Sequence, residues 1–334
     1  MALRKAGWQV IGIEPDPRRA AAAVAKGAVD CIGEPGPCDL AVVATPPSAL
    51  AGATHRLLDA GAAIVTDAGS VKAPVCAAVD DPRFVGGHPM AGSEQDGLDG
   101  AHPDLFRDSV WVLTPTATTG DAALAQVREI VSQFGAQPIA LAPERHDALV
   151  AVVSHVPHLT AAVLMRIAEG RSTTHRALLR LAAGGFRDMT RVAAGHPAIW
   201  PEICVENRAA ITDVLDELLA ELVEMRLIVS EGDRGELLAR LEAARESRRS
   251  LSVGAPEPSR LTEVRIAVRD QKGELARITT LAADLDVNIY DLEIAHSTEG
   301  ARGVALALVD SDAAEQFARS LNDAGYRPSL NPLG

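Results

Sequence analysis

Short apolar runs alternate with helical stretches along the first 142 residues, and this pattern constrains the fold more than any other feature. The runs are VIGI, LAVVATPP, AIVTDAGS, FVGGHP, SVWVLTP and QPIALA, and helical segments such as RRAAAAVAKGA and ALAGATHRLLDAG lie between several of them. Continuous apolar strands followed by a turn and a helix are typical of a parallel sheet covered on both faces. The sequence therefore predicts an α/β domain over residues 1–142, with ligands bound at the carboxyl ends of its strands.

The first seventeen residues, MALRKAGWQVIGIEPDP, contain only the second half of one βαβ unit. Residues 2–6 pattern as the last turn of a helix that ends at Gly7, and residues 9–13 as a buried strand that closes on Glu14. In a dinucleotide-binding unit, a strand and a G-x-G-x-x-G turn come first, and an acidic residue follows about 20 residues later. The acidic residue, Glu14, is present in this sequence, but no G-x-G-x-x-G turn precedes it. We therefore expect a Rossmann-like domain that is truncated at its N-terminus, with the natural start upstream of Met1.

The pattern changes twice after the sheet domain. Residues 143–250 show apolar positions at three- and four-residue spacing, which predicts an all-helical domain. Residues 251–260 are rich in Ser and Pro and are expected to be a linker. Residues 261–334 pattern as β-α-β-β-α-β, which is the element order of a ferredoxin-like module.

Composition excludes several classes of protein. A net charge of −13 argues against a nucleic-acid partner, because no basic surface is available to displace counterions. The most apolar stretch, residues 148–168, is interrupted by His155, Pro157, His158 and Arg166, so we expect no membrane span. Four widely spaced cysteines fit neither a disulfide framework nor a zinc site. No signal peptide follows Met1. We expect a cytoplasmic protein.

Two polar motifs follow predicted strands. In VGGHPMAGSEQDG, residues 85–97, His88 and Glu94 lie among small residues that let a ligand approach the backbone closely. A single loop histidine is more often structural than catalytic, and a single glutamate is usually solvated. In TDAGSVK, residues 66–72, Ser70 is expected to cap the next helix, to reach a ligand, or to do both. A third strand end, VATPP, has small residues against which a cofactor can pack.

Two further motifs lie in the helical region. SHVPH places His155 and His158 on one helix face, but no nearby carboxylate or cysteine completes a metal site, so no metal is expected. GGFRDMTRVAAGHPAIW, residues 184–200, contains Arg187, Asp188 and Arg191 after a glycine pair. An arginine fork suits a carboxylate ligand, although spacing alone equally favours a surface ion-pair cluster.

The order of these motifs along the chain resembles that of the prephenate and arogenate dehydrogenases of tyrosine biosynthesis. The motifs are DAGS-K, GGHPMAGSE, SHVPH, GGFRDMTR and a tryptophan nine residues after the last arginine. The resemblance runs from near residue 1 to about residue 230. It implies hydride transfer from C4 of a cyclohexadienol to NAD, with loss of the ring carboxylate as carbon dioxide. It assigns His88 as the hydrogen-bond acceptor for the C4 hydroxyl and Ser70 as its support. It implies a substrate-binding set that consists of Arg191, Asp188, Glu94, His155, His158 and Trp200.

The same resemblance implies the cofactor site. Glu14 would bind the ribose, and a carboxylate there repels a 2′-phosphate, so NAD is favoured over NADP. The other cofactor-binding positions are expected at the strand ends, at Thr45, Pro46, Asp67 and Gly69.

The C-terminal module resembles an ACT domain, a regulatory fold that binds amino acids, through DQKGELARI and VNIYDLEI. The matching effector positions are Asp270, Gly273, Leu275 and Asn288. We expect an aromatic amino acid effector, with tyrosine, the end product of the pathway, as the first candidate. The helical domain of this family also builds a dimer, so a homodimer is expected.

Three alternatives stay open at this point. The substrate is arogenate in place of prephenate if the pocket recognises an amino group where prephenate has a keto group, and the motifs do not distinguish the two. A β-hydroxyacid dehydrogenase shares the sheet-then-helices plan but gives no reason for GGHPMAGSE or for the C-terminal module. The third alternative is a catalytically silent amino-acid sensor that has lost cofactor binding with its glycine turn. Comparing NAD binding by this chain and by one extended upstream separates it from an enzyme.

Overall fold

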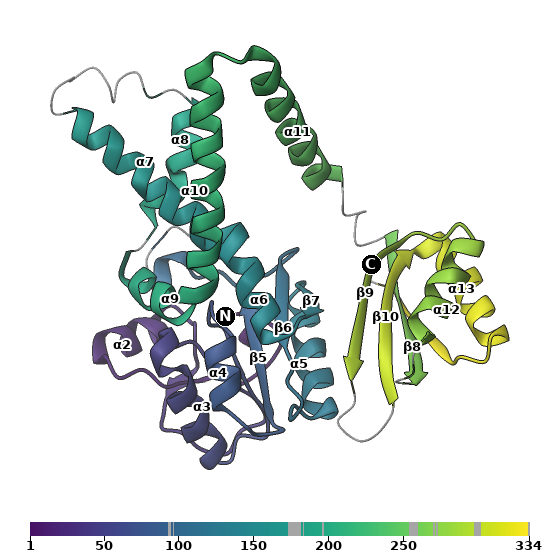
Figure 1. The fold of residues 1–334 in the computed structure, drawn as a ribbon. Helices are drawn as coiled ribbons and strands as arrows, with labels where there is room; N and C mark the ends of the chain where they lie inside the picture. The colour runs from purple at the N-terminus through teal and green to yellow at the C-terminus, as the bar shows by residue number, and fades with distance from the viewer. Residues whose placement is uncertain are drawn as a thin grey trace. The chain divides into compact units, whose positions relative to one another are not determined.

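The computed structural model describes residues 1–92, 95, 97–172, 182, 184–195, 197–253, 260–269, 271, 273–296 and 302–332. It divides into two compact units, Met1–Leu219 and Ala220–Gly334, which are described separately (Figure 1).

The first unit contains a five-stranded sheet in the order β3-β4-β5-β6-β7. Its strands are β3 (Ala41–Val43), β4 (Val65–Asp67), β5 (Phe84–Pro89), β6 (Val110–Thr114) and β7 (Gln137–Ala140). Neighbouring residues on a strand point to opposite faces, so Val65 and Phe84 pack with α3 (Leu50–Asp59) and α4 (Ala73–Ala78). Ile64 and Val85 pack on the other face with α5 (Asp121–Gln133). The predicted sheet with helices on both faces is confirmed.

The prediction that all its strands run parallel was wrong. The pairs β3–β4, β4–β5 and β6–β7 are parallel, but β6 runs antiparallel to β5, with His88 opposite Val112. A parallel return needs a crossover, usually an α-helix. Between β5 and β6 the described residues contain only the short 3₁₀ helix η2 (Gly97–Gly100). The chain therefore returns in the opposite direction.

The N-terminal elements form a small sheet of their own. The helix α1 (Ala2–Lys5) precedes Gly7, which has φ of +88°, and β1 (Ile11–Gly12) pairs in parallel with β2 (Cys31–Ile32) across α2 (Pro17–Ala25). Within residues 1–92 no ladder joins β1 to β3. Ile11, Ile13 and Val42 are 55%, 52% and 42% exposed, so apolar side chains flank both open strand edges.

Helices follow the sheet, as predicted. The helical run from Pro143 consists of α6 (Pro143–Val150), a π-turn (Ala151–His155) and α7 (Val156–Ser172). After it come α8 (Gly184–Thr190), two 3₁₀ turns, η5 (Arg191–Ala194) and η6 (Pro197–Ile199), α9 (Trp200–Glu206) and α10 (Arg208–Glu231). Ala151, Val156 and Ile211 form a small core between the run and α10. This core fixes the position of the polar side chains near the π-turn.

Pro143–Arg171 is long and apolar enough to span a membrane by length and composition alone. The most apolar part of this helix is 28% buried within the structure, and the helix carries the buried residues His146, Asp147 and His155. Ionisable groups are costly in lipid unless they face the interior of a protein.

The second unit contains α11 (Arg234–Val253) and a β-α-β-β-α-β module, whose element order was predicted correctly. Its antiparallel sheet has the order β11-β8-β10-β9, from β8 (Leu261–Arg269), β9 (Ile289–His296), β10 (Arg302–Asp310) and β11 (Pro328–Pro332). The helices α12 (Glu274–Asp284) and α13 (Ser311–Asp323) contribute Ile278, Phe317 and Leu321 to a core shared with the sheet. The module thus has a core independent of the first unit.

Candidate functional site

The predicted polar motifs meet at one edge of the five-stranded sheet. Thr45 follows β3, Ser70 follows β4, and His88 lies near the end of β5. Because β3, β4 and β5 are parallel neighbours, their carboxyl ends lie at the same edge. This edge is the candidate active site.

A buried ion pair organises the strand ends. Lys72 Nζ pairs with Asp67 Oδ2, and neither side chain has any exposed surface. Lys72 Nζ also donates to the Gly87 carbonyl at 3.0 Å. The Asp67 carboxylate accepts the N–H groups of Gly69 and Gly87, each at 2.9 Å. These bonds join the end of β4 to β5 beside His88.

The Asp67 side chain is engaged by protein partners, and its predicted role toward the cofactor stays a prediction. Both of its carboxylate oxygens accept bonds from protein donors, and the side chain is fully buried. Asp67 therefore has a structural role at the strand ends. Gly69 is also tightly enclosed, because a Cβ there would collide with Leu50.

His88 is linked to two residues of α6. Its Nδ1 lies 2.8 Å from His146 Nε2, and His146 Nδ1 lies 2.7 Å from Asp147 Oδ1. Burial, followed by the nearby His146, Lys72 and His155, lowers the pKa of His88 to about 3. The ring is therefore neutral at physiological pH, as a hydrogen-bond acceptor must be. No hydrogen bond within the described part of the chain reaches its Nε2.

Asp147, not Ser70, caps the helix α4. The Asp147 carboxylate accepts Lys72 N–H through Oδ1 and Ala73 N–H through Oδ2, both at 2.8 Å. The expectation that Ser70 is the helix cap was therefore wrong, since α4 begins at Ala73 with Lys72 at its N-cap. The half-buried Ser70 lies beside this helix start. Its predicted role toward a ligand stays a prediction.

His155, His158 and Trp200, predicted as pocket residues, form one cluster. The ring of His158 stacks on Trp200 at a centroid distance of 3.6 Å and an interplanar angle of 12°, and His155 meets Trp200 edge-on at 6.1 Å. Burial lowers the pKa of His155 to about 4 and also lowers that of His158. Both rings are therefore neutral near pH 7. Neutral rings beside an aromatic surface suit an uncharged ring of a substrate.

A π-turn and Asn207 orient His155. The turn, closed by Val156 N–H to Ala151 O, comes just before Pro157, which cannot supply an α-helical N–H. Asn207 Nδ2 donates to Asp147 O at 2.8 Å and lies 3.2 Å from His155 Nδ1. Because an amide nitrogen only donates, Nδ1 accepts and the proton of the neutral ring lies on Nε2. That buried Nε2 has no partner in the described part of the chain, which leaves a donor for a ligand.

The arginine motif lies next to this cluster. Arg191 begins η5, which packs on α7, and a Cβ on Gly195 would lie 3.8 Å from His158. Arg191 and Asp188 are both exposed, Asp188 on α8. Glu94 lies outside the described residues. The structure thus places the end of the arginine motif, at Gly195, beside His158, and the roles of Arg191, Asp188 and Glu94 stay predictions.

The predicted cofactor positions differ in their exposure. Thr45 has a buried hydroxyl without a partner in the described part of the chain, and Pro46 beside it is exposed. Glu14 is half-buried after β1, and its Oε1 accepts the Asp16 N–H at 2.9 Å. The roles of Glu14 toward a ribose and of Thr45 and Pro46 toward the cofactor stay predictions.

The predicted effector positions lie at both ends of α12. Gly273, with φ of +94°, caps the start of the helix and Leu275 lies in its first turn, whereas Asn288 follows its other end. A helix of this length spans about 16 Å, so one copy of the module does not bring these ends together. Asp270 lies outside the described residues.

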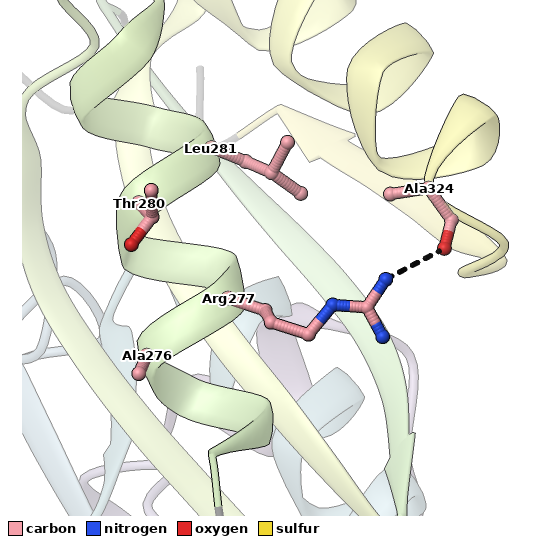
Figure 2. A pocket seen from close by; sticks show the side chains of 5 residues that line it. All are labelled: Ala276, Arg277, Thr280, Leu281 and Ala324. Carbon is pink, nitrogen blue, oxygen red and sulfur yellow. Dashed lines mark hydrogen bonds between the residues drawn. The ribbon is translucent and has the colours of Figure 1, made fainter.

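A shallow pocket of about 310 Å³ lies between α12 and the residue after α13. Figure 2 shows Arg277 reaching across it to the Ala324 carbonyl, with Ala276, Thr280 and Leu281 along the helix. This pocket does not contain the predicted effector residues.

Sequence reasoning missed four residues of the site: Lys72, His146, Asp147 and Asn207. Lys72 lies inside a motif that was noticed, but its pairing with Asp67 depends on folding. His146 lies 58 residues after His88, and no local spacing connects the two. Within the described part of the chain, no group of three His, Cys, Asp or Glu side chains could hold a metal ion.

The comparisons with known proteins agree with this geometry. Residues 1–140 match the nucleotide-binding domain of prephenate dehydrogenase, and residues 142–243 match the prephenate dehydrogenase dimerization domain. Prephenate dehydrogenase of Bacillus subtilis is 30% identical over 328 residues, 92% of this chain and 86% of the relative.

Two solved structures are also similar. Prephenate dehydrogenase from Aquifex aeolicus, in complex with hydroxyphenyl propionate and NAD+, has a TM-score of 0.70 and 27% identity over 75% of this chain and 92% of the other. Synechocystis arogenate dehydrogenase has a TM-score of 0.64 and 28% identity over 75% of this chain and 94% of the other. The family models, the B. subtilis relative and the histidine site at the strand ends together establish that the chain belongs to the prephenate dehydrogenase family.

Proposed function

We propose that this chain catalyses the NAD-dependent oxidative decarboxylation of prephenate to 4-hydroxyphenylpyruvate. The observation that carries the proposal is His88, a neutral histidine at the end of β5 whose Nδ1 is taken by His146 and whose Nε2 has no partner among the described residues. A neutral imidazole nitrogen at the ligand-binding edge of the sheet is what the C4 hydroxyl requires. Family membership supports the same reaction.

In this reaction the C4–H bond breaks and its electron pair leaves as hydride; NAD, when bound at the strand ends, would supply the hydride acceptor. The bond from the ring to its carboxylate also breaks, carbon dioxide leaves, and the released electron pair makes the ring aromatic. His88 accepts the hydrogen bond of the C4 hydroxyl while C4 gains carbonyl character, and the phenol keeps that proton in the product. Ser70 would hold the same hydroxyl from the end of β4. Aromatisation supplies most of the driving force.

The substrate is a dianion, and two donors of the predicted substrate-binding set suit its carboxylates. Arg191 offers a planar fork for bidentate binding, and Asp188, three residues earlier, would orient it. His155 offers its buried Nε2–H. His158 and Trp200 would pack against the ring. The orientation of C4 toward the nicotinamide then follows from fixing both ends of the substrate.

The test is NADH formation followed by absorbance, with prephenate and arogenate as separate substrates. We expect turnover with prephenate. Replacing His88→Asn should abolish turnover, whereas the control His55→Asn, at an exposed position of α3, should retain it. Turnover of arogenate alone would identify an arogenate dehydrogenase. NAD binding without turnover of either compound would refute the proposal.

We further propose a cytoplasmic homodimer formed through the helical domain. The support is the match to a dimerization domain and a set of apolar side chains on the Pro143–Ser172 run that are 52% to 66% exposed: Val152, Val153, Val163 and Ile167. A second copy would cover them. Sedimentation should give a dimer for the parent chain and a monomer for Val163→Glu. A parent chain that sediments as a monomer, or that partitions into detergent, contradicts this.

The C-terminal module is proposed to bind an aromatic amino acid, with tyrosine as feedback inhibitor. Its support is the β-α-β-β-α-β fold and the resemblance of its first turn to ACT domains. Because Gly273 and Asn288 lie at opposite ends of α12, a complete site would combine one end from each of two copies. Calorimetry with tyrosine, phenylalanine and tryptophan, on the dimeric chain and on residues 261–330, tests this. Absence of heat in both excludes the effector.

A further inference from the structure

Two buried side chains, His146 and Asp147, extend a chain of hydrogen bonds from the candidate catalytic residue His88. His88 lies on β5, and His146 and Asp147 are consecutive residues of α6. His88 Nδ1 lies 2.8 Å from His146 Nε2, and His146 Nδ1 lies 2.7 Å from Asp147 Oδ1. His146 is fully buried and Asp147 is 5% exposed, so water does not compete for these bonds.

The Asp147 carboxylate is fixed by its other partners. Lys72 N–H and Ala73 N–H each donate to it at 2.8 Å, and the Asp147 carbonyl accepts Asn207 Nδ2 at 2.8 Å. Two backbone donors hold the plane of the carboxylate, so Oδ1 stays directed at His146 Nδ1. The carboxylate of Asp147 and the ring of His146 therefore have a single orientation relative to each other.

The proton positions then follow from donor and acceptor chemistry. A carboxylate only accepts, so His146 carries a proton on Nδ1, and in the neutral form of that ring Nε2 is unprotonated. That nitrogen accepts from His88 Nδ1, which must therefore carry the proton of the His88 ring. The second nitrogen of His88, Nε2, is left with a lone pair.

We propose that Asp147 and His146 are positioning residues that hold His88 in the Nδ1-protonated tautomer, so that Nε2 is the acceptor for the substrate hydroxyl. The inference rests on the proposed function for the identity of that hydroxyl, but the tautomer itself is a property of the free protein. In the opposite tautomer, Nε2 would donate, and two donors would face each other at the substrate oxygen.

The first measurement is the tautomer of His88 in the substrate-free, full-length chain. Long-range ¹⁵N–¹H spectra of histidine-labelled protein distinguish protonated from unprotonated ring nitrogens, and a His88→Gln spectrum assigns the signals. We expect an unprotonated Nε2 and a protonated Nδ1. A protonated Nε2 overturns the proposal. This readout is independent of turnover, so it distinguishes failure of the inference from failure of the proposed function.

The second measurement uses Asp147→Asn, whose amide can donate to His146 Nδ1 and so reverse both rings. In serine proteases the equivalent change drops kcat by about 10⁴ through the wrong tautomer. We expect a loss of kcat by a factor of at least about 10³ with a much smaller change in KM, and a protonated His88 Nε2. Full activity, or an unchanged tautomer in a folded protein, refutes the role of Asp147.

The third measurement compares two replacements of His146. Gln can still accept from His88 Nδ1, whereas Leu cannot. We expect His146→Gln to keep the His88 tautomer and to retain more kcat than His146→Leu. A purely structural role would lower both variants equally and would leave the ¹⁵N pattern of His88 unchanged in each, and that outcome would refute the role of His146.

Discussion

The buried pair Lys72 and Asp67 gives the sharpest prediction about stability. In Lys72→Met the apolar stem is kept and the charge is lost, which leaves the fully buried Asp67 carboxylate with two backbone donors and no cation. Removing one partner of a buried ion pair costs about 3–5 kcal/mol, because the remaining charge is uncompensated. With a urea m-value of about 2 kcal/mol/M, the midpoint should fall by about 2 M.

The assay is urea unfolding followed by tryptophan fluorescence. Trp8, Trp111 and Trp200, the three tryptophans of the chain, all lie in the first unit, so the signal reports the unit that contains the pair. The control is Lys26→Met, which removes an exposed ion pair with Asp99 and should leave the midpoint nearly unchanged.

The double variant Asp67→Asn/Lys72→Met, together with the two single variants, completes a double-mutant cycle for the ion pair. Because it removes both charges, it should be less destabilised than the sum of the two single variants. If Lys72→Met unfolds at the same urea concentration as Lys26→Met, the pair does not hold the strand ends and the reasoning is refuted.

The site gives four other predictions. Because burial lowers the pKa of His88 to about 3, kcat/KM should stay level as the pH falls through 6.5, and a tenfold loss there would contradict the assignment. Below about pH 6.5 the unfolded chain, whose histidines have their ordinary pKa, binds more protons than the folded chain. The urea midpoint should therefore become lower as the pH is lowered in that range. Gly87→Ala should lower the Tm, because its Cβ would lie 2.6 Å from the Asp67 carbonyl oxygen, whereas Gly92→Ala has open space and should not; equal Tm values would contradict this. Glu14→Ala should narrow the preference for NAD over NADP in steady-state kinetics, and an unchanged ratio would exclude Glu14 from the ribose site.

Local pattern predicted much of the fold. The apolar runs and the glycines predicted strands and helices on both faces of a sheet, and the β-α-β-β-α-β order of the C-terminal module is present in the structure. The direction of β6 was not predictable in this way, because strand direction depends on how residues 90–109 return to the sheet. A run of apolar residues specifies burial but not direction.

The residues of the candidate site likewise fall into those that the sequence predicts and those that only the folded structure brings together. The sequence by itself placed His88 and Ser70 after strands, and His155 and His158 on a helix, because motif and position are local properties of the chain. Only the tertiary structure placed His146 and Asp147 behind His88, paired Lys72 with Asp67, and left His155 Nε2 without a partner among the described residues. The first of these features depends on α6 packing against the sheet edge, because the proton position on a histidine is set by the groups that packing brings within hydrogen-bonding distance.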